Sequence, residues 1–119
     1  MSPERARVLV VENEEMWQEI IKDALQGSGH QVVLTATSLE EALEAIERVK
    51  ELGIQVATID ANLHEGIHNG LDGKFFLETI REVAPKVKTI GLSSAKIEGV
   101  DVNLGKENCL DLADTITKI

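Results

Sequence analysis

Two stretches of the chain, VLVVENEE at residues 8–15 and VATIDANL at residues 56–63, share one pattern: a short, largely apolar run ends at an acidic residue. Runs that are apolar throughout are typical of strands buried on both faces, as in a parallel sheet covered by helices. The carboxyl ends of such strands converge on one crevice, where ligands and chemistry collect. We therefore expect Glu12 and Asp60 to lie together, and a carboxylate so placed is a candidate nucleophile or metal ligand.

Similar apolar runs recur along the chain and alternate with segments of helical spacing. The predicted strands are Arg7–Val11, Gln31–Ala36, Ile54–Ile59, Val87–Leu92 and Val100–Leu104. The predicted helices run from Glu14 to Gln26, from a capping box at Ser38 and Glu41 to just before Gly53, from Asp72-Gly73 to just before Pro85, and from Lys106 to Lys118. This order predicts a five-stranded, doubly wound α/β fold, with residues 1–119 as one domain.

Charge and composition exclude several classes of function. The net charge of −9 and the pI near 4.7 argue against nucleic acid and anionic membrane surfaces, because an acidic face repels phosphate. The lone Cys109 cannot form an internal disulfide, and no targeting segment or membrane-spanning run is evident. We expect a cytoplasmic protein whose partners are proteins or cations.

Four polar groups follow predicted strands and should face the same crevice. They are Glu12-Asn13-Glu14 after the first strand, Asp60 after the third, Ser93-Ser94 after the fourth and Lys106 after the fifth. An aspartate nucleophile for phosphoryl transfer needs a divalent cation, a hydroxyl and a lysine to balance the phosphoryl oxygens. The set therefore favours phosphoryl transfer over the alternative reading of strand-end and helix-capping residues.

In this order, the chain resembles the receiver domain of two-component response regulators over essentially its whole length. VLVVENEE is similar to the family's acidic-pair motif, VATIDANL to its phosphoacceptor motif, GLDG to the turn into its third helix, GLSS to its switch hydroxyl and LGKE to its lysine turn. The resemblance implies a flavodoxin-like sheet with strand order 2-1-3-4-5.

The resemblance also implies roles for individual residues. Asp60 would be the phosphoacceptor, with Ser93 and Lys106 contacting the phosphoryl oxygens. Mg²⁺ would be held by Glu12, Asn13, Asp60 and the backbone carbonyl of Asn62. The implied partners are a sensor histidine kinase or phosphotransfer protein and an unknown output protein; catalysis would be at most Mg²⁺-dependent self-phosphorylation and dephosphorylation of Asp60.

The chain departs from the family's pattern at several positions. Asn13 is neutral where the family usually has a second aspartate, which predicts weaker Mg²⁺ binding. Glu107 follows the lysine in place of a proline, and Asn103 stands where the family has a switch aromatic. Only a dozen residues separate Ser93 from Lys106, so the fourth helix is predicted to be very short or missing.

The loop between Asp60 and Gly73 is longer than the family norm and contains His64-Glu65-Gly66-Ile67-His68, a match to the HExxH zinc signature. Gly66 interrupts that segment and Asn69-Gly70 follows it. A helix holding both histidines on one face is therefore disfavoured, and with it a catalytic zinc site.

Three functions compete on the sequence alone. The leading hypothesis is a phosphoacceptor that signals by protein contact. The alternative is a pseudo-receiver, an interaction module of the same fold that phosphorylation does not switch. A third class, a small flavodoxin-like binder or hydrolase of phosphorylated ligands, would need a phosphate-cradling glycine loop where the sequence has acidic ENEE.

Overall fold

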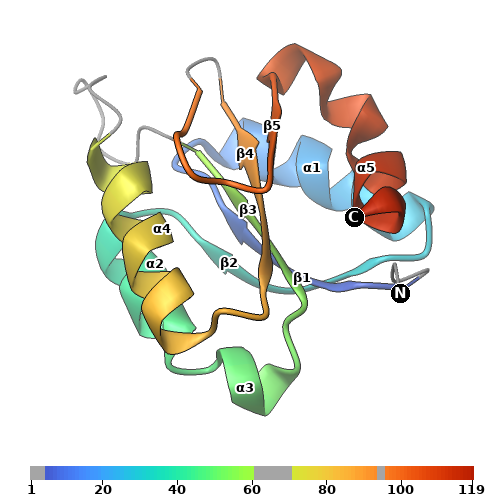
Figure 1. Ribbon diagram of the computed structural model, residues 1–119. Coiled ribbons are helices and arrows are strands. Elements are labelled where there is room, and N and C mark those ends of the chain that lie inside the picture. The colour runs from blue at the N-terminus through green and yellow to red at the C-terminus, as the bar shows by residue number, and fades with distance from the viewer. Residues whose placement is uncertain (1–4, 61–70, 94–95) are drawn as a thin grey trace.

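The computed structural model describes residues 5–60, 71–93 and 96–119, and a five-stranded parallel sheet lies at its centre (Figure 1). The strands follow the order β2-β1-β3-β4-β5, and each neighbouring pair is parallel. Their bounds are β1 Arg7–Val11, β2 Gln31–Ala36, β3 Val56–Ile59, β4 Lys88–Leu92 and β5 Val102–Leu104. The predicted flavodoxin-like order is confirmed.

Helices cover both faces of the sheet, as Figure 1 shows, with α2 and α4 on one side and α1 and α5 on the other. The helical elements are α1 Glu15–Gly27, α2 Leu39–Ile46, α3 Val49–Leu52, α4 Leu71–Val83, the 3₁₀ helix η1 Lys106–Asp111 and α5 Leu112–Lys118. No helix in the described part of the chain is long and apolar enough to cross a membrane.

The wholly apolar strands build two cores, one on each face of the sheet. Successive side chains of a strand point to opposite faces. In β1, for example, Leu9 and Val11 pack with α2 and α4, whereas Val8 and Val10 pack with α1 and α5. Burial on both faces explains why β1 and β3 carry no polar alternation. The parallel pairing of all five strands places their carboxyl ends at one edge.

Two predicted helices are broken, and these predictions were wrong in their continuity. The helix predicted from Ser38 ends at Ile46. There the N–H of Arg48 donates to the carbonyl of Ala45, three residues earlier, as in a tighter 3₁₀ turn, and the separate helix α3 begins at Val49. The last helix opens as the 3₁₀ helix η1, because Asn108 departs from helical backbone angles and Asn is a weak helix former.

Other bounds shift by a few residues. The predicted third and fifth strands begin two residues later, at Val56 and Val102, and α4 begins at Leu71, ahead of the Asp72-Gly73 turn. Element ends are the least certain part of a pattern-based prediction, because terminal residues carry few of the periodic contacts.

The connection from β4 to β5 contains no helix in its described residues, 93 and 96–101. This confirms the prediction that the fourth helix would be very short or missing. Segment 96–101 instead places the side chain of Ile97 in the core shared with α2 and α4. The inserted loop with Asn62, His64, Glu65 and His68 lies outside the described residues.

Candidate functional site

Glu12 and Asp60 meet at the carboxyl edge of the sheet, as expected from the ends of β1 and β3. Glu12 follows β1 directly and its N–H donates to the carbonyl of Ala36, while the N–H of Asp60 donates to the carbonyl of Val11. Backbone pairing with neighbouring strands therefore continues up to both acids. Their residues are only 1% and 3% exposed, so two carboxylates lie close together away from water.

Lys106 joins the two carboxylates from the turn after β5. Its Nζ lies 3.0 Å from Oε1 of Glu12 and 3.2 Å from Oδ2 of Asp60, and its side chain is 14% exposed. It also donates to Oε2 of Glu12 at 3.2 Å. The predicted convergence of these three residues, which are far apart in sequence, is therefore seen in the structure.

Ser93 completes the arrangement from the end of β4. Its Oγ donates to Oδ1 of Asp60 at 3.1 Å, and the serine is buried. The two oxygens of Asp60 thus have different partners, a hydroxyl on Oδ1 and an ammonium on Oδ2. Ser94 lies outside the described residues.

Burial and mutual repulsion make Glu12 hard to ionise. Desolvation is the largest cause, followed by the hydrogen bond and the negative charge of Asp60, and together they raise the pKa of Glu12 from 4.5 to about 7 despite the opposing effect of Lys106. Burial by itself would lower the pKa of Lys106, but its contacts with Glu12 and Asp60 outweigh this and raise it. The lysine therefore stays charged at neutral pH.

The donor set fits a hard divalent cation. Two buried carboxylates face one ammonium, which leaves excess negative charge when both are ionised. In the described part of the chain, Oε1 of Glu12 has no hydrogen-bond partner of good geometry, and the Lys106 ammonium lies 3.0 Å from it. Carboxylate oxygens are preferred ligands of Mg²⁺, which also keeps several waters.

Asn13, the neutral member of the predicted acidic pair, is partly exposed beside Glu12. Within the described residues no group of three or more His, Cys, Asp or Glu is placed to hold a metal ion. A cation at this site would therefore have two protein carboxylates, Glu12 and Asp60. Asn62, predicted to add its backbone carbonyl, falls outside the described residues.

Two neighbours of the site were not expected to contact it. Trp17 is partly buried and packs on the core of α1 and α5, but its ring also lies 5.5 Å from Nζ of Lys106. Gln18 donates from Nε2 to the carbonyl of Glu12 at 2.7 Å, which fixes the end of β1. Both residues lie in the first turn of α1, directly after the acidic cluster, and this spacing is the signal that could have identified them.

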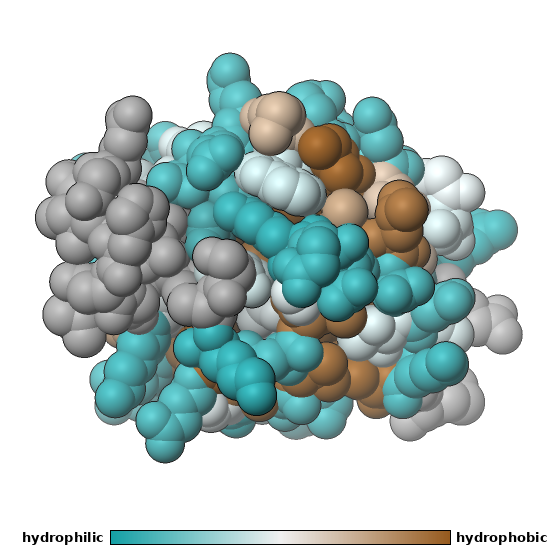
Figure 2. Space-filling model, turned by 90° about the horizontal axis from the view of Figure 1, so that it is seen from above, coloured by the Kyte–Doolittle hydropathy of each residue, from teal (hydrophilic) through white to brown (hydrophobic). Residues whose placement is uncertain are grey.

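The surface above the site is mainly hydrophilic. Figure 2 looks down on the carboxyl edge of the sheet, where hydrophilic residues occupy much of the middle of the view and hydrophobic residues appear at the upper right and in the lower middle. Exposed hydrophobic side chains near this edge are Met16 and Ile20 on α1 and Leu110 on η1, two elements that pack on each other.

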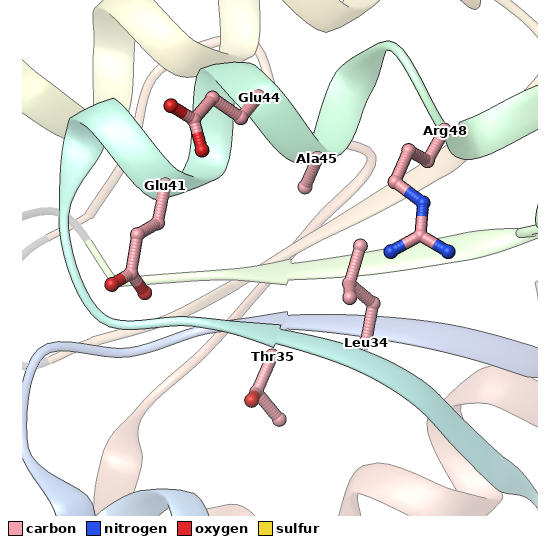
Figure 3. Close-up of a pocket in the computed structure, with 6 residues that line it drawn as sticks. All are labelled: Leu34, Thr35, Glu41, Glu44, Ala45 and Arg48. Carbon is pink, nitrogen blue, oxygen red and sulfur yellow. The ribbon is translucent and has the colours of Figure 1, made fainter.

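The hollow drawn in Figure 3 is a different place, about 320 Å³ in volume, between β2 and α2. Its lining residues are Leu34, Thr35, Glu41, Glu44, Ala45 and Arg48. None of them belongs to the buried cluster of Glu12, Asp60, Ser93 and Lys106. The candidate site of this molecule is therefore the small polar cluster and not that hollow.

Comparison with known proteins agrees with this geometry. The family model of the response regulator receiver domain matches residues 8–118. The chain is 31% identical over 88 residues to the chemotaxis protein CheY of Thermotoga maritima, and the match covers 74% of this chain and 67% of that protein.

Solved structures show the same fold. A receiver domain protein from Clostridium thermocellum has a TM-score of 0.76 at 25% identity, and the match covers 95% of this chain and 92% of that one. A CheY-like receiver domain from Methanospirillum hungatei has a TM-score of 0.76 at 19% identity, covering 96% and 92%. The CheX–CheY–BeF3–Mg complex from Borrelia burgdorferi matches with a TM-score of 0.71 at 19% identity, covering 84% and 77%.

Proposed function

Because this chain belongs to the response regulator receiver domain family, we propose that Asp60 accepts a phosphoryl group from a phosphohistidine on a sensor kinase or phosphotransfer protein. The modified chain then signals by binding an output protein. We place this exchange in the cytoplasm, as the sequence led us to expect.

The distinct partners of the two Asp60 oxygens support this proposal most directly. One carboxylate oxygen attacks the phosphorus atom, a P–O bond forms and the P–N bond to the donor histidine breaks. Three phosphoryl oxygens then need charge balance at the place where Ser93 and Lys106 already converge on Asp60, within 3.1 and 3.2 Å. Donors positioned before the reaction cost no reorganisation during it.

Mg²⁺ is the proposed cofactor, and receiver domains generally use it at their acidic pocket. Glu12 and Asp60 would hold it, with Asn13 beside them and the backbone of Asn62 as the predicted further ligand. When bound, the ion neutralises charge that develops on the phosphoryl oxygens. Because Asn13 adds no negative charge, the expected affinity is weaker than that of a site with two acids beside the phosphoacceptor.

Exposed apolar residues next to the site offer a docking surface for the phosphodonor. Met16, Ile20 and Leu110 are 62%, 37% and 84% exposed, and α1 and η1 carry them beside the turn that holds Lys106. A partner that covers this surface would bring its histidine to the buried carboxylate of Asp60 and would exclude water during transfer.

The direct test is to incubate the protein with acetyl phosphate and Mg²⁺ and to measure its intact mass. Wild type is expected to gain one phosphoryl adduct, and Asp60→Asn none, because the amide is not a nucleophile of this kind. Asp114→Asn, an exposed aspartate on α5, is the matched control and should be modified like wild type. An adduct that persists in Asp60→Asn would contradict the assignment.

The pseudo-receiver is the second candidate, and one observation favours it: Lys106 already pairs with both carboxylates, so the cluster has its own cation. On that reading Asp60→Asn still binds the output partner and wild type gains no adduct at any Mg²⁺ concentration. The same mass measurement therefore separates the two functions.

A further inference from the structure

We propose that Asn103 is a positioning residue whose side-chain amide clamps the β4–β5 connection to β5 and so holds Ser93 and Lys106 in place around Asp60. The catalytic consequence rests on the proposed function of Asp60. The clamp itself is a geometric claim and can be tested without phosphorylation.

The amide of Asn103 uses both its donor and its acceptor on one residue. Its Oδ1 accepts from the N–H of Ile97 at 2.9 Å, and its Nδ2 donates to the carbonyl of Ile97 at 3.0 Å. A side-chain amide can satisfy both backbone groups of a residue in this way because it carries the same two functions as a peptide group. The Asn103 side chain therefore satisfies the backbone N–H and carbonyl of Ile97, as pairing with a neighbouring strand would.

Gly91 makes room for the clamp. It is paired with Asn103 across β4 and β5, so the two residues face the same side of the sheet. A Cβ at position 91 would lie 2.6 Å from Oδ1 of Asn103, closer than real Cβ contacts allow. A side chain at Gly91 and the Asn103 amide in this position thus exclude each other.

Further contacts hold the same connection, so the clamp acts on an ordered segment. Ile97 is 3% exposed and lies in the core with α2 and α4. Asp101 accepts from the N–H of Thr89 at 2.8 Å, and Arg81 of α4 lies 3.7 Å from Asp101 and donates to the carbonyl of Gly99. Segment 96–101 thus packs on the α2 and α4 face of the sheet.

In the sequence, the clamped residues Ile97 and Asn103 lie between Ser93 and Lys106, the two proposed phosphoryl-binding residues. Ser93 precedes Ile97 by four residues, and Lys106 follows Asn103 by three. β5 is only three residues long and lies at the edge of the sheet, so its ladder with β4 offers few bonds to fix the turn at Lys106. The two hydrogen bonds of the Asn103 side-chain amide attach β5 to the β4–β5 connection and so give that turn a second support.

Trp17 provides a local readout of Lys106 that needs no phosphodonor. It is the only tryptophan of the chain, there is no tyrosine, and Nζ of Lys106 lies 5.5 Å from its ring. A lysine that leaves this position changes the polarity around the indole. The Lys106→Ala variant defines the emission shift for complete loss of the ammonium.

The experiment compares wild type with Asn103→Ala, Gly91→Ala and the double variant. Both single changes are expected to move the Trp17 emission in the direction of Lys106→Ala, by at least half its shift. The double variant should match Asn103→Ala alone, because the added methyl then has no amide to displace. Gln26→Ala, which removes an exposed side-chain amide in the last turn of α1, is the control and should leave the emission unchanged.

Phosphorylation by acetyl phosphate supplies the second readout. Asn103→Ala should slow phosphorylation at saturating Mg²⁺ by several-fold, while its Mg²⁺ dissociation constant stays within two-fold of wild type, since Glu12 and Asp60 lie on other strands. A merely structural residue would lower the melting temperature without separating rate from metal affinity in this way.

The outcomes distinguish the clamp from the function. If wild type is not phosphorylated but the emission shifts follow the expected pattern, the clamp stands and the proposed function fails. If wild type is phosphorylated while folded Asn103→Ala keeps both its emission and its rate, the clamp is overturned. Additive effects of the two single changes in the double variant would also overturn it.

Discussion

At the scale of single residues, the site is a compromise between burial and charge. Glu12 and Asp60 are buried carboxylates that share one ammonium, and burial together with the negative charge of Asp60 favours the neutral form of Glu12. A protein selected only for stability would not place them there. Such an arrangement is typical of a functional site, where a cation or a transferred group supplies the missing charge balance.

The raised pKa of Glu12 gives the metal-free protein a distinct pH dependence. Between its ordinary pKa of 4.5 and its folded pKa of about 7, the folded state keeps a proton that the unfolded state has released. The proton held by Glu12 therefore stabilises the folded state at low pH, and this stabilisation is lost as pH rises through that window. Urea unfolding at several pH values should show the loss, and Glu12→Gln should flatten it; a wild type no steeper than Glu12→Gln would contradict the assignment.

At the scale of elements, helix α4 carries apolar residues both on its buried face and on its solvent-exposed face. The helix carries the apolar residues Phe75, Phe76, Ile80 and Val83. Phe76 and Ile80 are fully buried against the sheet, but Phe75 and Val83 are 52% and 47% exposed. Adjacent residues on a helix are about 100° apart, so only one of two neighbouring phenylalanines can face the core.

The two phenylalanines therefore form a matched pair for mutation. Phe76→Ala is expected to lower the unfolding free energy by about 3–5 kcal/mol, because it removes a fully buried ring and leaves a cavity. Phe75→Ala should change it by less than about 1 kcal/mol, as at other half-exposed positions. Urea denaturation of the two variants measures the difference, and equal costs would show that α4 is rotated from the position described.

Helix α2 begins at the capping box that the sequence predicts. Oγ of Ser38 accepts from the N–H of Glu41 at 3.1 Å, and the Glu41 carboxylate accepts from the N–H and the hydroxyl of Thr37. These bonds lower the pKa of Glu41, the backbone bond to Thr37 being the larger cause. The Ser38 cap is as the sequence predicts, whereas the return bond of the Glu41 carboxylate goes to Thr37 and not to the N–H of Ser38.

Ser38→Ala is expected to lower the unfolding free energy by about 1 kcal/mol, the usual value for loss of an N-cap side chain. The control is Ser28→Ala, where the hydroxyl only donates to the carbonyl of Ala24 at an exposed position, and it should cost clearly less. Thermal unfolding of both variants provides the measurement. A larger loss in Ser28→Ala than in Ser38→Ala would reject the cap as the stabilising element.

At the scale of the whole molecule, the parallel sheet brings together residues from four strand ends. Residues 12, 60, 93 and 106 are spread across nearly the whole chain, so the site exists only when the chain is folded. A ligand that binds such a site stabilises the folded state by mass action, because the unfolded chain offers no equivalent site.

Mg²⁺ is therefore expected to raise the unfolding free energy, by about 2.7 kcal/mol at a concentration one hundred times its dissociation constant. Chelation should reverse the gain. Asp60→Asn should remove most of it, since one of two carboxylate ligands is lost, while NaCl at equal ionic strength controls for screening. An equal gain in Asp60→Asn and wild type would mean that the ion binds elsewhere.

The apolar pattern of the sequence by itself predicted a parallel sheet and placed Glu12, Asp60, Ser93 and Lys106 at one edge of it, and the family resemblance implied the strand order. Apolar strands buried on both faces admit one kind of layer structure, and acids, hydroxyl and lysine placed at strand ends are bound to meet at one edge. Only the tertiary structure decided how they meet. The sharing of Lys106 by two carboxylates, the ring of Trp17 beside it and the grip of Asn103 on Ile97 depend on contacts between residues distant in the chain. The breaks in two predicted helices depend on backbone angles and bonds that no local period encodes.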